Sequence, residues 1–285
     1  MKENTESKTE KNKFVYTPEV IRRIQLIELE MLKELDRICR KHQISYIIES
    51  GTLLGAVRHG GFIPWDDDLD VRMLRKEYDR FCEVCREELN PDYFLQTYRT
   101  DPGYRWGYAR ILKNGTVYKR KGQHKMTARN GVFIDIFPDD NLPEGRFSNR
   151  ICTCISWLCR KLLYSEVGVL NRKKFISWLG FSFLNLFPKE WGHRGMEYIV
   201  KRYQGMDTAR VRCFAWGSEA EALGILKKWH TETENIRFEG LAVPAPKDRN
   251  GFLIHFFGKD YMTPPPKEKR VLGHPADYID FGDEG

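Results

Sequence analysis

The stretch Gly51–Met73 constrains the fold most, because it joins a glycine-bracketed segment to a dense run of carboxylates. Its first part, Gly51–Gly55, follows Ser45–Glu49, which predicts a short buried strand that delivers the chain to a tight turn. A short helix at 53–59 is expected next. Backbone amides in such a turn, or at the start of that helix, can approach a phosphate closely. The expected phosphate contacts are Gly51, Thr52 and Gly55, with a plain tight turn as the alternative.

Four carboxylates, Asp66, Asp67, Asp68 and Asp70, crowd the second part of this stretch. If Asp68–Met73 is a strand, Asp68 and Asp70 point to the same face. Two carboxylates on one face repel each other unless a cation lies between them. Mg²⁺ suits that position because it favours a few carboxylates plus water and phosphate oxygens, and Mn²⁺ would also be accepted. A solvated acidic turn is the alternative, but Pro and Trp before the cluster and apolar alternation after it disfavour that interpretation.

A lone acid, Asp135, interrupts the apolar segment Val132–Phe137. The segment predicts a buried strand that ends at Pro138. A carboxylate in the middle of a buried strand is costly unless it is paired or bound to a metal. We therefore expect Asp135 to be a third carboxylate at the site of Asp68 and Asp70.

Composition favours an intracellular protein with anionic partners. The 285 residues carry a formal net charge of +7, and the 41% hydrophobic content is enough for a core. Seven cysteines without framework spacing indicate a reducing compartment, and the polar first residues contain no apolar leader. No zinc-finger, RNP or basic-zipper pattern points to nucleic acid. The expected location is therefore the cytoplasm.

The remaining patterns predict an α/β (α+β) fold, a mixed sheet flanked by helices. Helices are expected at 18–41 and 75–89 and strands at 93–97, 109–112, 116–119 and 242–245, with a strand or short helix at 252–256. We divide the chain into a disordered tail (1–13), a catalytic core (14–145), a helical insertion (146–205) and a part completing the core (206–285).

The insertion mixes apolar-aromatic segments, 151–164 and 175–187, with basic residues. The first interpretation is a lid or subdomain packed on the core, since buried helices are apolar and surface helices are often basic. The second is peripheral docking on the inner face of an anionic membrane. The basic residues concerned are Arg150, Arg160, Lys161, Arg172, Lys173, Lys174 and Lys189. A basic loop at 119–130, which includes His124 and Lys125, is expected either to hold an anionic substrate or to be solvated.

Several motifs, in this order, resemble those of the LicD family, which includes fukutin and fukutin-related protein. The matches run from about residue 25 to 275, and are sparse only through 146–205. They are Gly51–Gly55 with Arg58-His59, Gly61–Asp70, Gly131–Pro138, Phe238–Gly240, and Phe257–Met262 with Pro265-Pro266. One departure is Lys259, at a loop position where Gly or Asp is expected.

The resemblance implies a nucleotidyltransferase-like fold and the transfer of a phosphorylated alcohol from a CDP-activated donor to a sugar hydroxyl. The similar enzymes move phosphocholine from CDP-choline onto surface glycans such as capsule, lipopolysaccharide or teichoic acid, and the fukutin relatives move ribitol phosphate. CDP-ribitol or CDP-glycerol is therefore the alternative donor. A choline group would favour an aromatic cage, for which Trp106, Tyr108, Tyr118 and Trp216 are candidates.

Roles for the site residues follow from this resemblance. Asp68, Asp70 and Asp135 would hold Mg²⁺, and either Asp135 or Asp66 would take the proton of the acceptor hydroxyl. The sequence does not choose between them. Arg58 is expected to bind a donor phosphate through its bidentate fork, and His59 to assist it, with a surface ion pair and a packed loop residue as the respective alternatives.

Other functions were weighed against this one. A DxD glycosyltransferase using a UDP- or GDP-sugar usually begins with a nucleotide-binding βαβ unit, whereas this chain begins with a long helix. A calcium-binding loop from Asp66 to Glu77 fails, because Val71 stands where glycine is required and Pro64 prevents a leading helix. A membrane-associated scaffold without catalysis would tolerate Asp68→Ala, whereas an enzyme would not.

Overall fold

The computed structural model describes residues 16–121, 123, 126–170, 174–218, 222–270 and 272–282. The predicted tail at 1–13 lies outside this range, as do His124, Lys125, Arg172 and Lys173.

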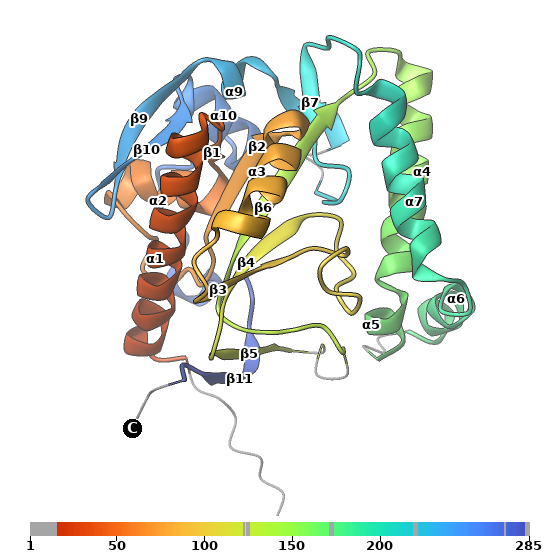
Figure 1. The fold of residues 1–285 in the computed structure, drawn as a ribbon, viewed down its shortest axis with the longest axis horizontal. Coiled ribbons are helices and arrows are strands. Elements are labelled where there is room, and N and C mark those ends of the chain that lie inside the picture. The colour runs from red at the N-terminus through yellow and green to blue at the C-terminus, as the bar shows by residue number, and fades with distance from the viewer. Residues whose placement is uncertain are drawn as a thin grey trace, which may run out of the picture.

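A mixed sheet forms the centre of the molecule (Figure 1). Its main path runs β1-β2-β6-β4-β3, where β2 and β6 are parallel and the other neighbours antiparallel. Strands β7 and β8 extend it from the far end of β6. The predicted α/β class is therefore confirmed. The strands are β1 (Ile47–Ile48), β2 (Asp70–Leu74), β3 (Tyr93–Gln96), β4 (Ala109–Lys113), β6 (Phe133–Asn141), β7 (Arg210–Arg212) and β8 (Ile225–Leu226).

Strand β6 corrects one prediction, because it does not end at Pro138 but continues to Asn141. Pro138 is in register with Met73 of β2, and Asp139 with Leu74. A proline lacks only the backbone donor, so the chain stays extended through it. The extension carries two further buried carboxylates, Asp139 and Asp140, into the structure.

Helices α1 (Pro18–His42) and α3 (Arg75–Glu88) pack against β6 and against each other. Both were predicted from their apolar periodicity. Thr17 caps α1, since its Oγ1 accepts a hydrogen bond from the Val20 amide at 3.3 Å. The buried face of α1, which includes Ile24, Leu32 and Leu35, belongs to the main core.

Helix α2 (Ser50–His59) corrects a second prediction, because the segment Gly51–Gly55 is its first part and not a tight turn. The helix packs against β2, α10 (Arg249–Phe257) and the hairpin β9 (Thr233–Phe238)–β10 (Leu241–Pro246). The short helix α9 (Lys228–Thr231) precedes this hairpin. Segment 252–256, predicted as a strand or short helix, therefore lies in a helix.

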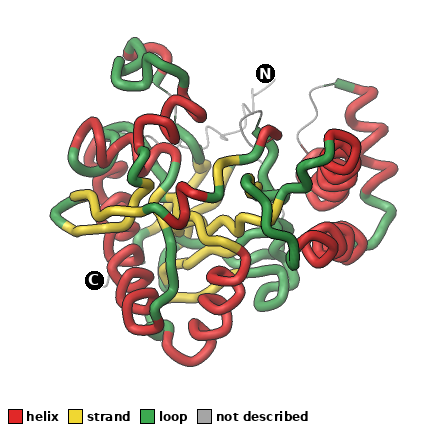
Figure 2. Tube along the Cα trace, turned by 90° about the horizontal axis from the view of Figure 1, so that it is seen from above, coloured by secondary structure: helices red, strands yellow, loops and turns green. Residues whose placement is uncertain are grey.

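The insertion forms a helical layer beside the sheet, as Figure 2 shows from above. It comprises α4 (Arg146–Leu163), α5 (Ser165–Leu170), α6 (Phe175–Leu184) and α7 (Lys189–Tyr203). Helices α4 and α7 pack together around a separate apolar cluster that contains Cys152, Met196 and Ile199. In the described part of the chain, no helix is long and apolar enough to cross a membrane.

A small two-stranded sheet joins β5 (Val117–Arg120) to β11 (Ala276–Asp280). A single 3₁₀ turn, η1 (Lys267–Lys269), lies on the way to β11. The pairing returns a late segment of the chain to the edge of the core. As a result, Gly273 and His274 lie beside the carboxylates of residues 66–70.

Candidate active site

A cavity of about 600 Å³ opens where β2, β6 and the start of α2 meet. Its wall combines carboxylates, aromatic rings and two arginines, a mixture that suits a charged ligand with an apolar part. The carboxylates are Glu49, Asp66, Asp68, Asp70, Asp135 and Asp260, and the aromatic side chains are Trp65, Phe137, Trp216, Phe256, Phe257 and Tyr261. The arginines are Arg58 and Arg72, and His274 completes the polar wall.

Asp70 and Asp135 are brought together by the parallel pairing of β2 with β6, in which they are direct register partners. The Asp70 amide donates to Thr52 Oγ1 at 2.9 Å, which ties β2 to α2. The Asp70 side chain is different, because its Oδ1 is buried without a hydrogen-bond partner among the described residues. Burial and the neighbouring Asp68 charge raise the pKa of Asp70 well above its usual value.

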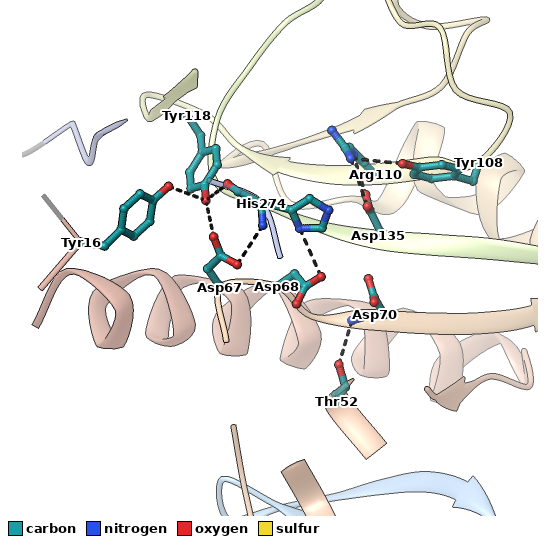
Figure 3. Close-up of polar contacts among 10 residues, drawn as sticks. All are labelled: Tyr16, Thr52, Asp67, Asp68, Asp70, Tyr108, Arg110, Tyr118, Asp135 and His274. Carbon is teal, nitrogen blue, oxygen red and sulfur yellow. Dashed lines mark hydrogen bonds and ion pairs between the residues drawn. The ribbon is translucent and has the colours of Figure 1, made fainter. Parts of the chain in front are cut away.

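Asp135 is held by β4, the neighbour of β6 on the side away from β2. Arg110 of β4 donates to both carboxylate oxygens, from Nε to Oδ1 and from Nη2 to Oδ2 at 3.1 Å (Figure 3). Arg110 Nη2 also lies 3.3 Å from the hydroxyl of Tyr108. Burial raises the pKa of Asp135, and the Arg110 charge opposes that shift. Arg110 thus compensates the charge of Asp135. The described residues offer no such partner to Asp70 Oδ1.

Asp66 and Asp68 form a second pair of neighbouring carboxyls. Burial, followed by the charge of Asp68, raises the pKa of Asp66 well above its usual value. Gln25 of α1 positions the loop, since its Nε2 donates to the Asp66 carbonyl oxygen at 2.9 Å. Gly51 allows the approach to α2, because a Cβ there would lie 2.7 Å from Asp66 Oδ2.

Asp67 anchors the site to the late segment. Its Oδ1 accepts from the His274 amide at 3.1 Å, and its Oδ2 from the Tyr118 hydroxyl at 3.0 Å. Tyr16 lies 3.1 Å from the same hydroxyl (Figure 3). Burial and the charge of Asp68 raise the pKa of Asp67 to about 6. Asp67 is thus a positioning residue and not part of the cavity wall.

His274 approaches the site through its imidazole, whose Nδ1 lies 3.2 Å from Asp68 Oδ2. One oxygen each of Asp67 and Asp68 and one nitrogen of His274 lie within 4.8 Å of one another, a spacing that a single metal ion could bridge.

A buried ionic network supports the floor of the cavity. Arg72 of β2 donates to Glu49 through Nε and to Asp139 Oδ1 through Nη1 at 2.6 Å. His230 Nε2 lies 2.7 Å from the other oxygen of Asp139. These groups lie almost completely out of water, so removing one would leave an uncompensated partner. The network holds Glu49, at the start of α2, against β2.

The predicted phosphate-binding residues separate into two groups. Gly51 and Arg58 line the cavity, and Arg58 Nη1 donates to the Tyr261 carbonyl oxygen at 3.1 Å. Thr52, Gly55 and His59 do not line it. Thr52 binds the Asp70 amide, and Gly55 packs closely against the loop of Gly61. His59 is exposed and lies edge-on to Trp65, with ring centroids 6.2 Å apart.

The donor set fits a hard divalent cation. Asp68 and Asp70 line the cavity together, and the orphaned Oδ1 of Asp70 is a buried ligand atom without a protein partner in the described range. Oxygen ligands of this kind favour Mg²⁺ or Mn²⁺ over softer metals.

Comparisons with known proteins identify relatives of this chain. Residues 43–151 match the family model described as the LicD/FKTN/FKRP nucleotidyltransferase domain. The chain carries a LicD-family domain. The chain is 28% identical over 269 residues to the lipopolysaccharide cholinephosphotransferase LicD of Haemophilus influenzae, an alignment that covers 89% of the chain and 96% of that protein. It is also 50% identical over 120 residues to an uncharacterized protein of Rickettsia prowazekii, which covers 41% of each chain. The relationship supports a transferase.

Sequence reasoning missed several residues of the candidate site. Arg110 lies in a predicted strand, but no pattern indicated that its side chain faces Asp135. His274 lies 206 residues beyond Asp68 in a segment without periodicity. Of the proposed aromatic-cage residues, only Trp216 lines the main cavity, together with the unpredicted Trp65, Phe256, Phe257 and Tyr261. Trp106 and Tyr108 line a second cavity.

Proposed function

We propose that the protein transfers phosphocholine from CDP-choline to a sugar hydroxyl of a cell-surface glycan, lipopolysaccharide or teichoic acid, and releases CMP. The observation that carries this proposal is one cavity in which carboxylates for a metal, Arg58 and several aromatic rings converge. The relative named as a lipopolysaccharide cholinephosphotransferase adds independent support.

The wall of the cavity suits a donor with a cationic end. A quaternary ammonium is stabilised by aromatic faces and by nearby negative charge. Phe257 and Tyr261 offer aromatic surface beside the carboxylate of Asp260. These residues form the proposed choline end of the site.

The diphosphate would lie between the arginines and the carboxylates. Arg58 and Arg270 flank Trp65, with their guanidinium carbons 5.9 and 4.0 Å from its ring centroid. Burial, together with the charge of Arg270, lowers the pKa of Arg58. Two neighbouring guanidiniums without a carboxylate partner in the described part of the chain favour an anion between or beside them.

The proposed metal ligands are Asp68 and Asp70, with Asp135 closing the shell. A bound Mg²⁺ would neutralise the charge that develops on the diphosphate and on the departing CMP. The protein's own contribution is to present these oxygens on two adjacent strands and on the loop that leads into β2, so that little reorganisation accompanies the reaction.

The chemical step is a displacement at phosphorus. The acceptor hydroxyl oxygen forms a bond to the phosphorus that bears choline, and the bond from that phosphorus to the bridging oxygen breaks, so that CMP leaves with its electron pair. Asp66 is the proposed base that takes the hydroxyl proton. It is favoured over Asp135 because both oxygens of Asp135 already accept bonds from Arg110.

Donor turnover tests this proposal. The protein would be incubated with Mg²⁺, a glycan extract and, in turn, CDP-choline, CDP-ethanolamine, CDP-glycerol, CDP-ribitol, a UDP-sugar and a GDP-sugar. We expect CMP from CDP-choline, at a rate that Asp68→Ala lowers by about 100-fold or more. Release of CMP only from CDP-ribitol or CDP-glycerol would show that the proposed donor is wrong. Release of UDP or GDP would show that the proposed reaction class is wrong. Full activity of Asp68→Ala would exclude the site.

We also propose that the protein works in the cytoplasm at the inner face of the membrane, in contact with it through residues 146–205. Helix α6 supports this, because its ten residues are all uncharged, most of them apolar, and none of them is buried. Phe175 and Ile176 are 71% and 82% exposed, and Phe183 is 61% exposed. An apolar surface of this size on a soluble chain marks an interaction site.

The charges beside α6 favour an anionic lipid surface as the occupant. Lys174 directly precedes the helix, and Lys161 of α4 lies 5.7 Å from the ring of Phe181. Glu190 is the acidic neighbour on α7, and Glu166 on α5 is 3.4 Å from Arg105. Ten residues are too few to span a bilayer, so an interfacial position is expected.

Vesicle sedimentation tests this contact. We expect the protein to sediment with vesicles that contain phosphatidylglycerol and less with phosphatidylcholine alone. The double variant Ile176→Ser/Phe183→Ser should lose this binding. Leu26→Ser, an exposed site on α1, is the matched control and should retain it. Unchanged vesicle binding by the double variant would overturn the proposal. So would a wild-type protein that does not bind vesicles but forms a dimer, if the double variant were monomeric.

A further inference from the structure

A second cavity, of about 720 Å³, lies between the core and the insertion. Its core side is formed by the segment 105–108, Arg120 of β5 and the segment 215–218. Its other side is formed by α4, with Tyr164 beyond its end and Met196 of α7. Neither the metal ligands nor Arg58 belong to it.

The second cavity adjoins the active-site cavity. Trp216 and Ser218 line both of them. Trp216 contacts the ring of Phe137, at a centroid distance of 5.7 Å, and Phe137 lines the active-site cavity. Trp216 therefore lies at the boundary of the two cavities.

The charges of the two cavities are opposite. The active-site cavity is lined by six carboxylates, whereas the described residues that line the second cavity include no Asp or Glu. Its charged side chains are Arg105, Arg120, Arg160 and Lys161. A ligand that carries negative charge is therefore attracted to the second cavity, and a quaternary ammonium is repelled from it.

Two of these four cationic side chains already interact with other groups of the protein. Arg160 Nη1 donates to the carbonyl oxygens of Phe214 and Trp216 at 2.8 and 3.1 Å, and Arg105 lies 3.4 Å from Glu166. Arg120 and Lys161 differ, because neither has a carboxylate within ion-pair distance in the part of the chain that the structure describes. These two side chains, on opposite walls, are available to an anion.

The uncharged part of the wall includes five aromatic side chains. Trp106 and Tyr108 lie on the core side, and Trp157 and Tyr164 on the helical side, with Trp216 at the boundary. The C–H faces of a pyranose ring are apolar while its hydroxyls are polar, so flat aromatic side chains with polar neighbours suit sugar rings. A nucleotide base would also stack there, but the donor's diphosphate is expected at the carboxylates that can hold the metal.

We propose that the second cavity binds the acceptor, and that this acceptor is an anionic glycan. Its sugar rings lie on the aromatic wall, a phosphate or carboxylate of the chain lies between Arg120 and Lys161, and the reacting hydroxyl passes Trp216 to reach Asp66 and the donor. This inference rests on the proposed phosphotransferase function, because that function supplies the need for a second substrate.

Binding measurements with a glycan probe test the inference without relying on activity. The probe is an oligosaccharide that carries a phosphate ester, and its partner is the same oligosaccharide after phosphatase treatment. With the wild-type protein we expect the phosphorylated probe to bind at least about tenfold more tightly, and its affinity to fall with added salt. Trp157 and Trp216 line the cavity, so tryptophan fluorescence reports the binding.

Two variants localise the site. Lys161→Ala and Trp157→Ala should each weaken binding of the phosphorylated probe about tenfold and leave CDP-choline binding in Mg²⁺ unchanged. Lys201→Ala and Tyr198→Ala are the matched controls, because both residues lie on α7 outside the cavity wall. The controls should bind both ligands as the wild type does.

The outcomes separate this inference from the proposed function. Equal affinity for the two oligosaccharides, or unchanged affinity in both cavity variants, would overturn the anionic acceptor site. If the wild type released no CMP from any donor but bound the phosphorylated probe through Lys161 and Trp157, the proposed reaction would fail and the glycan site would stand. If CMP were released normally and the acceptor KM did not rise in either variant, the acceptor would bind elsewhere.

Discussion

Asp70 and Asp135 are register partners on adjacent parallel strands, yet only Asp135 has a cationic partner of its own. Arg110 satisfies both oxygens of Asp135, whereas Oδ1 of Asp70 is buried without a partner among the described residues. Two carboxylates that share a position in the sheet are thus in opposite electrostatic states. One is compensated by the protein, and the other is left for a ligand.

This difference predicts opposite effects of two isosteric substitutions. Asp70→Asn should lower activity by about 100-fold or more, because a metal ligand is lost, but leave the free energy of unfolding in EDTA unchanged or higher. Asp135→Asn should lower that free energy by about 3–5 kcal/mol, because the buried charge of Arg110 loses its partner. Urea unfolding in EDTA and CMP release in Mg²⁺ measure the two effects. Strong destabilisation by Asp70→Asn would contradict the assignment.

Gly55 predicts a local stability effect. A Cβ at this position would overlap the carbonyl oxygen of Gly61 and lie 3.1 Å from the Ile63 amide nitrogen, so Gly55→Ala should cost about 1–3 kcal/mol. Gly180→Ala is the control, because Gly180 also lies within a helix but has no neighbouring atom within 4 Å among the described residues. That control should be neutral or stabilising by about 0.5–1 kcal/mol. Chemical denaturation compares the two, and equal midpoints would contradict the packing argument.

We predict that a substitution at Glu28 stabilises the protein. It is buried on α1, and its Oε2 has no hydrogen-bond partner among the described residues. Burial, with Asp68 and Asp67 nearby, raises the pKa of Glu28 well above that of the unfolded chain. Between the unfolded pKa and the raised folded pKa, the folded state therefore binds more protons than the unfolded chain, and stability falls as pH rises through that window. Glu28→Gln should remove this dependence and raise the free energy of unfolding in EDTA, by about 1 kcal/mol or more at neutral pH.

The control for this prediction is Glu30→Gln, at an exposed position of the same helix. Its effect on stability should be within about 0.5 kcal/mol at any pH tested. A Glu28→Gln protein that is less stable than the wild type at neutral pH would show that Glu28 is ionised and paired in the folded state.

We predict that His193, at the junction of core and insertion, makes the stability of the protein depend on pH. Its ring stacks on Tyr98 at 4.2 Å, and burial, followed by the charge of Arg105, lowers the pKa of His193 to about 4. Glu190 and Glu197 face it and oppose this shift. In the unfolded chain a histidine titrates near 6.5. The stability that depends on a neutral His193 is therefore complete above that pH, and it is lost as the pH falls towards 4.

Titration by NMR measures this pKa directly. Thermal unfolding between pH 7 and pH 4.5 should show a smaller loss of stability for His193→Gln than for the wild type, because Gln cannot bind the proton. A His193 resonance that titrates near 6.5 in the folded protein would contradict the prediction.

The sequence predicted those features of the fold that local patterns determine. Apolar periodicity located α1 and α3 within about a residue, and alternation located β3 and β4. It failed at Gly51–Gly55, where glycines indicated a turn although the segment is helical. Those glycines are explained by close packing of α2 against Asp66 and the loop of Gly61, a tertiary constraint that local rules do not contain.

The candidate site was predictable to the same extent. Asp68 and Asp70 were predicted to share a strand, but β2 begins at Asp70 and Asp68 lies in the loop before it. The burial of Asp135 followed from its apolar neighbours, so the proximity of these carboxylates was expected. Arg110 and His274 could not be predicted, because their contacts depend on which strands become neighbours and on where β11 returns. The opposite charges of the two cavities likewise follow from the position of the insertion, which no local pattern specifies.

The hydrogen bond between Asp67 and the His274 amide joins residues that are 207 positions apart. During synthesis on the ribosome, the carboxylates of residues 66–70 emerge long before the segment that completes their surroundings. A nascent chain that has already formed α1, β2 and β6 therefore still lacks this anchor. A chain truncated before residue 274 would lack this hydrogen bond to Asp67, however complete its strands β2 and β6 are.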